Sequence, residues 1–301
     1  ILKSNSKKEQ IDIYFARANI LHKEKNYKES ARYLELANEL KLILNPSHPD
    51  ILIKKSQSLL IESLKTNINQ KENKKYPQSI FIVGMPRSGS TLIESILSMN
   101  ISVKDLGEIN IFEESFEEQR KNSEETTLAE SYWKKVNNEK DEWKITTNKW
   151  LYNYQYTGII ASQIPNAIII HSFRNPLDNI LSIYRTNFAR GSKYSSSLID
   201  CTKIYLNHEN IMTKYKSKFR SNIYDLNYDS LVSNPNKEIK DLISYLGWKW
   251  DDAYLAHHLN RRSVTTASVV QVRSPINSKS IGGWKNYKQM LIPAIEILTK
   301  N

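Results

Sequence analysis

The sequence has only one cysteine, Cys201, among 301 residues. A single cysteine excludes an internal disulfide and any metal site that needs several thiolates, so Cys201 is expected to pack as a small apolar side chain. Histidines are few and scattered, and the pair His257-His258 has no further ligand at a standard metal spacing. We therefore predict no bound metal.

Long apolar runs are missing as well. No stretch approaches the roughly 18–20 residues that a bilayer crossing needs, so we predict that nothing in this chain spans a membrane. The sequence begins with Ile1 and not with methionine. We expect an upstream part, with any signal or anchor it carried, to be missing.

Acidic residues are outnumbered, with 32 Asp and Glu against 43 Lys and Arg, which gives a net charge of +11 and a pI of about 9.4. This excess of positive charge is compatible with nucleic-acid binding, but a lysine-rich solvated surface with an anion-binding cleft explains it more simply. We predict no nucleic-acid partner. The hydrophobic fraction of 40% describes a foldable globular protein, long enough for one sizeable domain and a smaller module.

The first part of the chain has the periodicity of helices. Residues 10–42 indicate two amphipathic helices joined at Lys25-Asn26, and a third is expected near 50–64. The pair resembles a single tetratricopeptide-type repeat, although any helical hairpin has similar spacings. One repeat cannot bury its outer face, so a protein partner or a homodimer through the helices is implied. We divide the chain into a helical segment, 1–70, and a second domain, 76–301.

The most informative motif of the second domain, at residues 80–97, resembles a phosphate-binding loop but lacks the usual lysine. Ile80–Val83 predict a buried strand, Gly84-Met85-Pro86 a turn, and Thr91–Leu97 a helix. Strand, glycine loop and helix N-terminus make an anion cradle of backbone N–H groups. A nucleotide P-loop reads G-x-x-x-x-G-K-[ST]. Here Ser90 replaces its lysine and Arg87 lies inside the loop, which argues against ordinary ATP or GTP hydrolysis and favours another phosphate-bearing donor.

A second strand–loop–helix follows at residues 167–185. The apolar run Ala167–His171 predicts a parallel strand covered on both faces, and Pro176 opens a helix. Residues 223–228 alternate as a third strand, and 236–246 predict a helix. The expected fold is α/β, a P-loop-like parallel sheet preceded by the small helical segment, with ligand loops at the carboxyl ends of the strands.

The turn at the end of that second strand carries another candidate anion site. Arg174 offers a planar fork suited to a phosphate, and Ser182, two turns into the helix, adds a neutral hydrogen bond. An arginine at a helix start is more often a surface residue, yet its pairing with the loop at 84–91 favours function. Two anion sites on neighbouring strand ends suit a donor with phosphates at both ends, unlike ATP.

These motifs together resemble those of bacterial tetratricopeptide-repeat sulfotransferases, which are related to the protein-tyrosine sulfotransferases. The likeness covers essentially residues 10–297. It is carried by the sequences VGMPRSGST, GE at 107–108, NKWLYN, RNPLDNILS, NFARG, Tyr228 and QVRSPIN…GGW. The resemblance implies 3′-phosphoadenosine 5′-phosphosulfate (PAPS) as donor, transfer of a sulfuryl group to an acceptor hydroxyl, and a bacterial cytoplasmic location.

The resemblance also assigns donor-binding residues. The 5′-phosphosulfate would be held by Arg87, Ser88, Gly89, Ser90 and Thr91. The 3′-phosphate would be held by Arg174 and Ser182, with Tyr228 near the adenine and Ser268 touching the donor. This sequence departs from the family at two places: Gly283 stands where a lysine precedes the tryptophan, with Lys279 and Lys285 nearby, and Asn187 replaces an arginine for which Arg190 would substitute.

Catalysis would rest on three residues. Arg87 and Lys149 are expected to absorb the charge that develops on the leaving phosphate, and Glu108 is the candidate general base. The tyrosine-directed relatives have two adjacent glutamates and use the second, whereas Ile109 follows Glu108 here. A plain surface glutamate on the same acidic stretch as Glu113 and Glu114 is the alternative. Lys149 has a similar alternative as an exposed lysine.

Other functions stay open at this point. A P-loop kinase or NTPase is the second enzyme candidate, but the strand ending in His171-Ser172 offers no Asp for Mg²⁺. A non-catalytic repeat scaffold would explain residues 10–64 and leave the arginine loop without a role. The acceptor hydroxyl belongs to a protein (tyrosine included), a glycan or a small molecule. Four aromatic residues either line a substrate site or pack in the core, namely Trp150, Tyr152, Tyr154 and Tyr156.

Overall fold

A computed structural model describes most of the chain, namely residues 6–66, 76–121, 126–136, 144–188, 192–260 and 272–300. It divides into two compact units. The first contains Ile1–Lys54, Arg174–Glu209 and Lys279–Asn301, and the second contains Lys55–Phe173 and Asn210–Ser278. The predicted domains 1–70 and 76–301 stay a prediction, because the units follow spatial compactness and not the order of the chain.

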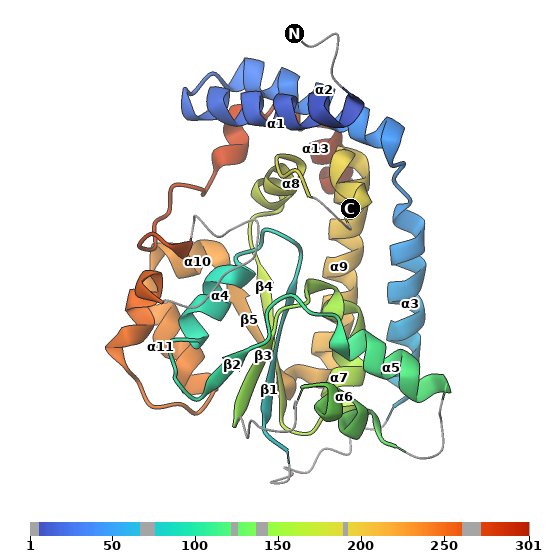
Figure 1. Cartoon of the computed structure of the whole chain (residues 1–301), viewed down its shortest axis with the longest axis vertical. Coiled ribbons are helices and arrows are strands. Elements are labelled where there is room, and N and C mark those ends of the chain that lie inside the picture. The colour runs from blue at the N-terminus through green and yellow to red at the C-terminus, as the bar shows by residue number, and fades with distance from the viewer. Residues whose placement is uncertain are drawn as a thin grey trace. The chain divides into compact units, whose positions relative to one another are not determined.

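The second unit is built on a five-stranded sheet. The strands are β1 (Gln78–Gly84), β2 (Val103–Asp105), β3 (Ile145–Asn148), β4 (Ala167–Phe173) and β5 (Ile223–Asn227). They lie in the order β2-β3-β1-β4-β5, and every neighbouring pair is parallel. The predicted parallel-sheet α/β fold is confirmed, and β1 with its glycine loop lies at the centre of the sheet (Figure 1).

Helices cover both faces of this sheet. In the described part of the second unit the helices are α4 (Ser90–Leu97), α5 (Ile111–Lys121), α6 (Leu128–Val136), η2 (Leu151–Tyr156), α7 (Thr157–Gln163), η4 (Arg220–Asn222), α10 (Tyr228–Ser233), α11 (Pro235–Tyr245) and η5 (Asp252–Leu259). Parts of α3 (Pro49–Lys65) and α9 (Leu198–Phe219) also belong to it. α4, α10 and α11 lie on one face, and α6 and α7 on the other (Figure 1). Parallel strands need such crossovers, which is why both faces are buried.

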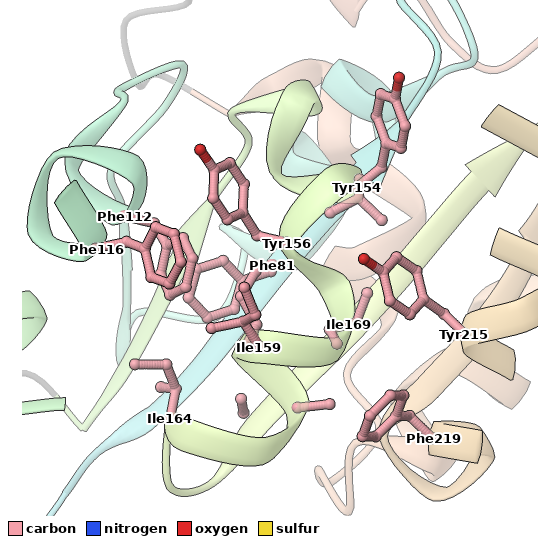
Figure 2. Close-up of a cluster of buried hydrophobic side chains, with 14 of the residues drawn as sticks. Phe81, Phe112, Phe116, Tyr154, Tyr156, Ile159, Ile164, Ile169, Tyr215 and Phe219 are labelled. Atoms are coloured by element: carbon pink, nitrogen blue, oxygen red, sulfur yellow. The ribbon is translucent and has the colours of Figure 1, made fainter. Parts of the chain in front are cut away.

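β1 shows how the sequence makes two cores. Successive side chains of a strand point to opposite faces, so Phe81 and Val83 enter the core that contains α5, α6 and α7, while Ile80 and Ile82 enter the core beneath α4 and α11. All four are fully buried. Figure 2 shows the aromatic side of the first core, where the Phe81 ring meets that of Phe112 at a centroid distance of 5.7 Å.

The sequence did not predict two of the strands. β2 is three residues long, and β3 reads Ile-Thr-Thr-Asn, without the apolar run that marks a covered strand. Thr146 and Thr147 are nevertheless fully buried. The neighbouring strands decide this burial, because β3 lies between β1 and β2 and its backbone groups are paired on both sides.

The first unit is helical within the described residues. It contains α1 (Lys7–Lys23), α2 (Tyr27–Leu44), α8 (Pro176–Tyr184), η3 (Lys193–Ser196), η6 (Gly283–Tyr287), α13 (Ile292–Thr299) and parts of α3 and α9. α1 begins with a capping box in which Ser6 and Glu9 bond each other's backbone N–H. α1 and α2 form the predicted hairpin, with a turn at Lys25, where φ is +61°. The repeat assignment itself stays a prediction. No helix of the described residues combines the length and the apolar character that a membrane crossing requires.

Gly158 in α7 gives a direct test of the packing. A Cβ there would lie 2.5 Å from Ser63 and under 3 Å from the rings of Tyr215 and Phe219. Gly158→Ala should therefore lower the free energy of unfolding by about 1–3 kcal/mol, even though alanine favours a helix over glycine by about 1 kcal/mol. Urea unfolding measures this. Gly283→Ala is the control, since its nearest neighbour would be 3.8 Å away, and a change within about 0.5 kcal/mol is expected. Equal stability of both variants would contradict the tight packing of α7.

Candidate functional site

The loop between β1 and α4 has the backbone of an anion cradle. Gly84 (φ +150°) passes so close to β4 that a Cβ would lie 2.2 Å from the Ser172 carbonyl oxygen. Gly89 is the N-cap of α4 with φ +101°, and no side chain caps this helix. The first N–H groups of a helix have no partner within it. They therefore point, with the positive end of the helix dipole, at whatever occupies the loop.

Two residues of this loop are unusual, Arg87 in its backbone conformation and Ser88 in its side-chain environment. Arg87 has φ +67°, a left-handed conformation that costs a non-glycine residue of order 1–3 kcal/mol. Ser88 is buried, and its Oγ has no hydrogen-bond partner among the described residues. Strain at a cation and a buried hydroxyl without a partner, side by side, are features of a ligand loop. A phosphate or sulfate ester would supply the acceptor that Ser88 lacks.

Tyr228 lies against the same loop. It is the first residue of α10, where Asn227 caps the helix by accepting hydrogen bonds from the N–H groups of Asp229 and Ser230. A Cβ on Gly89 would lie 2.3 Å from the Tyr228 ring. Only glycine fits under this ring, so the fold brings a predicted donor-binding residue onto the loop from a strand end about 140 residues away.

Lys149 and Glu108 form an ion pair. Lys149 follows β3, and its Nζ lies 2.7 Å from Glu108 Oε1 in a charge-assisted hydrogen bond. The Lys149 side chain is fully buried, whereas that of Glu108 is 42% exposed. The backbone supports the pair, because Lys149 N–H donates to the Gly107 carbonyl. Lys149 is thus not an exposed surface lysine.

Glu94 joins this pair and was not singled out by the sequence. It lies on α4, one turn beyond Ser90, and its Oε2 is 3.7 Å from Lys149 Nζ. Burial raises the pKa of Glu94 to about 7; Lys149 opposes the rise, and Asp105 and Glu108 add to it. The available signal was an acidic residue inside the largely apolar segment Leu92–Leu97, a position where a glutamate is seldom buried without a reason.

In the first unit, Arg174 and α8 hold the segment that follows Lys279. Arg174 is buried and its Nη2 donates to the Ser280 carbonyl at 3.0 Å. Asp178 accepts hydrogen bonds from the N–H groups of Gly282, at 2.7 Å, and Trp284, at 2.9 Å. Asp178 is therefore a positioning residue that the sequence motif contained but did not single out. α8 starts as predicted, with Asn175 as N-cap and Pro176 in the first turn, and Ser182 lies half-buried on it.

The remaining predicted positions differ in their outcome. Ser268 and Arg190 lie outside the described residues. Lys279 and Lys285 are exposed. Tyr154 and Tyr156 are core residues with 1% and 0% exposure, so these two do not form a substrate wall; Trp150 and Tyr152 are half-buried and pack together at 5.7 Å. His257 is buried, and burial lowers its pKa to about 4.

A parallel sheet whose central strand ends in a strained, arginine-bearing anion loop beside a buried lysine defines a class of α/β proteins that bind phosphate or sulfate esters. Comparison with known families makes the class specific. The model of the sulfotransferase family matches residues 77–252, more than half of the chain. The chain belongs to the sulfotransferase family.

Solved structures agree with this fold. The sulfotransferase domain from the olefin synthase of Synechococcus PCC 7002 has a TM-score of 0.52 and 17% identity, covering 78% of this chain and 98% of that one. The sulfotransferase domain from the curacin biosynthetic pathway has a TM-score of 0.53 and 15% identity, covering 75% and 97%. At these identities the likeness concerns the fold.

A relative known from sequence extends further along the chain. An uncharacterized protein of Aquifex aeolicus (strain VF5) is 30% identical over 312 residues, which cover 94% of this chain. The chain spans about two fifths of the length of that relative, since the match covers 41% of it. Most of the relative therefore has no counterpart in this sequence.

Proposed function

We propose that this protein is a PAPS-dependent sulfotransferase that moves a sulfuryl group from the donor to an acceptor hydroxyl. The observation that carries the proposal is the lysine-free loop. In it, Arg87 is held at a positive φ next to Ser88, whose hydroxyl has no hydrogen-bond partner in the described part of the chain. Membership in the sulfotransferase family supports the same reaction. A kinase or NTPase is disfavoured, because neither the family nor the loop sequence fits it.

The donor is proposed to be held at both of its ends. Arg87, Ser88 and the N–H groups at Gly89, Ser90 and Thr91 would hold the 5′-phosphosulfate. Its charge suits the α4 N-terminus, and Tyr228 over Gly89 would face the adenine. Arg174 and Ser182 are proposed for the 3′-phosphate. The sequence assigns Ser268 to the same donor.

The proposed reaction is an in-line displacement at sulfur. Glu108 would take the proton of the acceptor hydroxyl as its oxygen bonds to sulfur, and the bond between sulfur and the bridging phosphate oxygen would break. Arg87 and Lys149 would offset the negative charge that grows on the leaving phosphate. Positioning and electrostatics supply most of such catalysis, as in phosphoryl transfer. The hydrogen bond between Lys149 and Glu108 must break before Glu108 can accept the proton and Lys149 can contact the leaving phosphate.

Calorimetry with adenosine 3′,5′-bisphosphate (PAP) tests the donor assignment. We expect PAP to bind without any metal and more tightly than adenosine 5′-monophosphate, because the 3′-phosphate adds the Arg174 contact. Transfer of ³⁵S from labelled PAPS to an acceptor should also proceed with a chelator present. Binding that requires Mg²⁺ and prefers ATP would contradict the proposal.

The acceptor class is decided by a transfer screen. Tyrosine peptides are the first class to test, with oligosaccharides and small hydroxyl compounds beside them, each incubated with labelled donor. We propose further that the exposed side of α1, where Ile20 is 48% exposed, contacts a protein partner or a second copy. Sedimentation of the protein, and of Ile20→Lys as its control, tests that part.

A further inference from the structure

Glu94 is a buried carboxyl group that the proposed reaction does not use. Only 8% of the residue is exposed, and its Oε1 has no hydrogen-bond partner among the described residues. Its Oε2 lies 3.7 Å from the Lys149 ammonium, which is an ion-pair distance and not a hydrogen bond, and the Gly107 backbone N–H donates one hydrogen bond to the carboxyl group. Burying a carboxylate with so little compensation is costly. A group kept under these conditions is suited to changing its charge.

The ammonium of Lys149 is shared between two unequal carboxylates. An ammonium has three N–H donors, and the described residues account for one hydrogen bond, to Glu108. Glu108 is 42% exposed at its side chain and is solvated, whereas Glu94 is 11% exposed and cannot turn to water. Lys149 therefore has donors left for a ligand, and Glu94 is the counter-charge that stays in place when Glu108 turns away.

An anionic donor changes the charge balance at this cluster. Glu94 and Glu108 already share the Lys149 ammonium, Asp105 adds a negative charge that acts on Glu94, and a phosphosulfate beside Lys149 adds more. Ser90, one helical turn before Glu94, is a proposed donor contact on the same face of α4. Repulsion between the donor and three carboxylates in a poorly solvated site would weaken binding. It is relieved if the least solvated carboxylate takes a proton.

We propose that Glu94 is a positioning residue whose charge is exchanged for that of the donor. In the free enzyme the Glu94 carboxylate offsets the positive charge of Lys149. When the donor binds, its phosphate supplies this negative charge instead, and Glu94 takes one proton from solvent. It returns that proton to solvent when the product PAP leaves, and no covalent bond other than this O–H bond forms or breaks. The inference rests on the proposed function, in which Lys149 faces the donor and Glu108 is the base.

The titration of Glu94 suits this role. Its pKa of about 7 results first from burial, with Lys149 and the Gly107 amide lowering it, and Asp105 and Glu108 raising it. η5, which also packs on α4, brings the imidazoles of His257 and His258. Near neutral pH, Glu94 is thus partly ionised, and added negative charge raises its pKa further. Because the complex then binds more protons than the free enzyme, affinity falls as the pH rises through this range.

The test is calorimetric titration with PAP in buffers of different ionisation enthalpy, from pH 6.5 to 8.5. At pH 7.5, wild type should take up about half a proton more per PAP bound than Glu94→Gln does. PAP has its own titrating phosphate, with a second pKa of about 6, and the difference between the two proteins cancels its contribution. Glu238→Gln on α11, whose partner is Lys237 at 3.6 Å, is the matched control and should behave as wild type.

Glu94→Gln also separates this role from a structural one. A neutral amide imitates the protonated carboxyl, so the variant should match wild-type affinity at pH 6.5 and bind PAP several-fold more tightly at pH 8.5. Damage to the fold would weaken binding at every pH. Should Glu94→Gln not fold, Glu94→Asp draws the carboxyl back by one methylene and should lose part of the proton uptake.

The outcomes distinguish the role of Glu94 from the proposed sulfotransferase function. Unchanged proton uptake and pH dependence in the folded Glu94 variant would overturn the role of Glu94 and leave the proposed function intact. A wild-type protein that does not bind PAP would overturn the proposed function, and this inference with it. Tighter binding of Glu94→Gln above pH 7.5, with the uptake lost, is the result that supports both.

Discussion

Arg87→Ala should abolish sulfuryl transfer while the protein stays folded. In phosphoryl transfer an arginine that stabilises the transition-state charge accelerates the reaction by about 10³–10⁵-fold, and a loss of similar size in kcat/KM is expected here. The fold should survive because Arg87 is half-buried in a loop and belongs to neither of the two hydrophobic cores of the sheet. Steady-state transfer of labelled sulfate and circular dichroism measure the two effects.

Two further arginine variants make this prediction sharper. Arg87→Gly removes the cost of the positive φ, so it should stabilise the protein by about 1 kcal/mol and still be inactive. Arg32→Ala, on the exposed face of α2, removes a surface ion pair with Glu29 and a contact with the Tyr33 ring, and full activity is expected. Full activity of Arg87→Ala would show that the loop does not hold the sulfuryl end.

Glu108→Gln should lower kcat by about 10²–10⁴-fold, the usual contribution of a general base. Glutamine keeps the size of the side chain and an oxygen that can accept from Lys149, but it cannot take the acceptor's proton. PAP affinity should change little, because Glu108 is assigned to the acceptor side. The measurement is kcat at saturating acceptor, together with calorimetric PAP binding to the same variant.

The control for Glu108→Gln is the same substitution on the acidic helix that follows. Glu114 lies on α5 and pairs with Lys135 at 3.9 Å, so Glu114→Gln removes a weak surface pair. Near-normal turnover is expected for Glu114→Gln. Near-normal turnover of Glu108→Gln as well would transfer the role of base to another residue, and the interpretation of Glu108 as a surface glutamate would then hold.

Much of the fold followed from local patterns. β1, α4, β4 and α8 were predicted within a few residues, because continuous apolar runs, a glycine loop and Asn175-Pro176 are signals that a short window contains. β2 and β3 carry no such signal. Their burial results from strands elsewhere in the chain, which is why propensity and periodicity missed them.

The residues of the candidate site also fall into those that local sequence identifies and those that only tertiary packing brings together. Arg87 and Ser88 were identified from their motif, since a loop between a strand and a helix carries its own geometry. The importance of Glu94 was not visible, because a single glutamate in an apolar helix gives no indication of its partner. Lys149 directly follows β3, 55 positions further along the chain, and only the sheet order brings Glu94 and Lys149 together.

Local sequence patterns were therefore enough to identify the anion loop and the strand and helix that carry it. The reason is that backbone conformation at glycine, proline and apolar runs is set by neighbours in the chain. Only the tertiary structure decided that Lys149 is buried, that Glu108 and Glu94 share it, and that Tyr228 covers Gly89. Burial and charge depend on what packs around a group, and those neighbours come from distant parts of the chain.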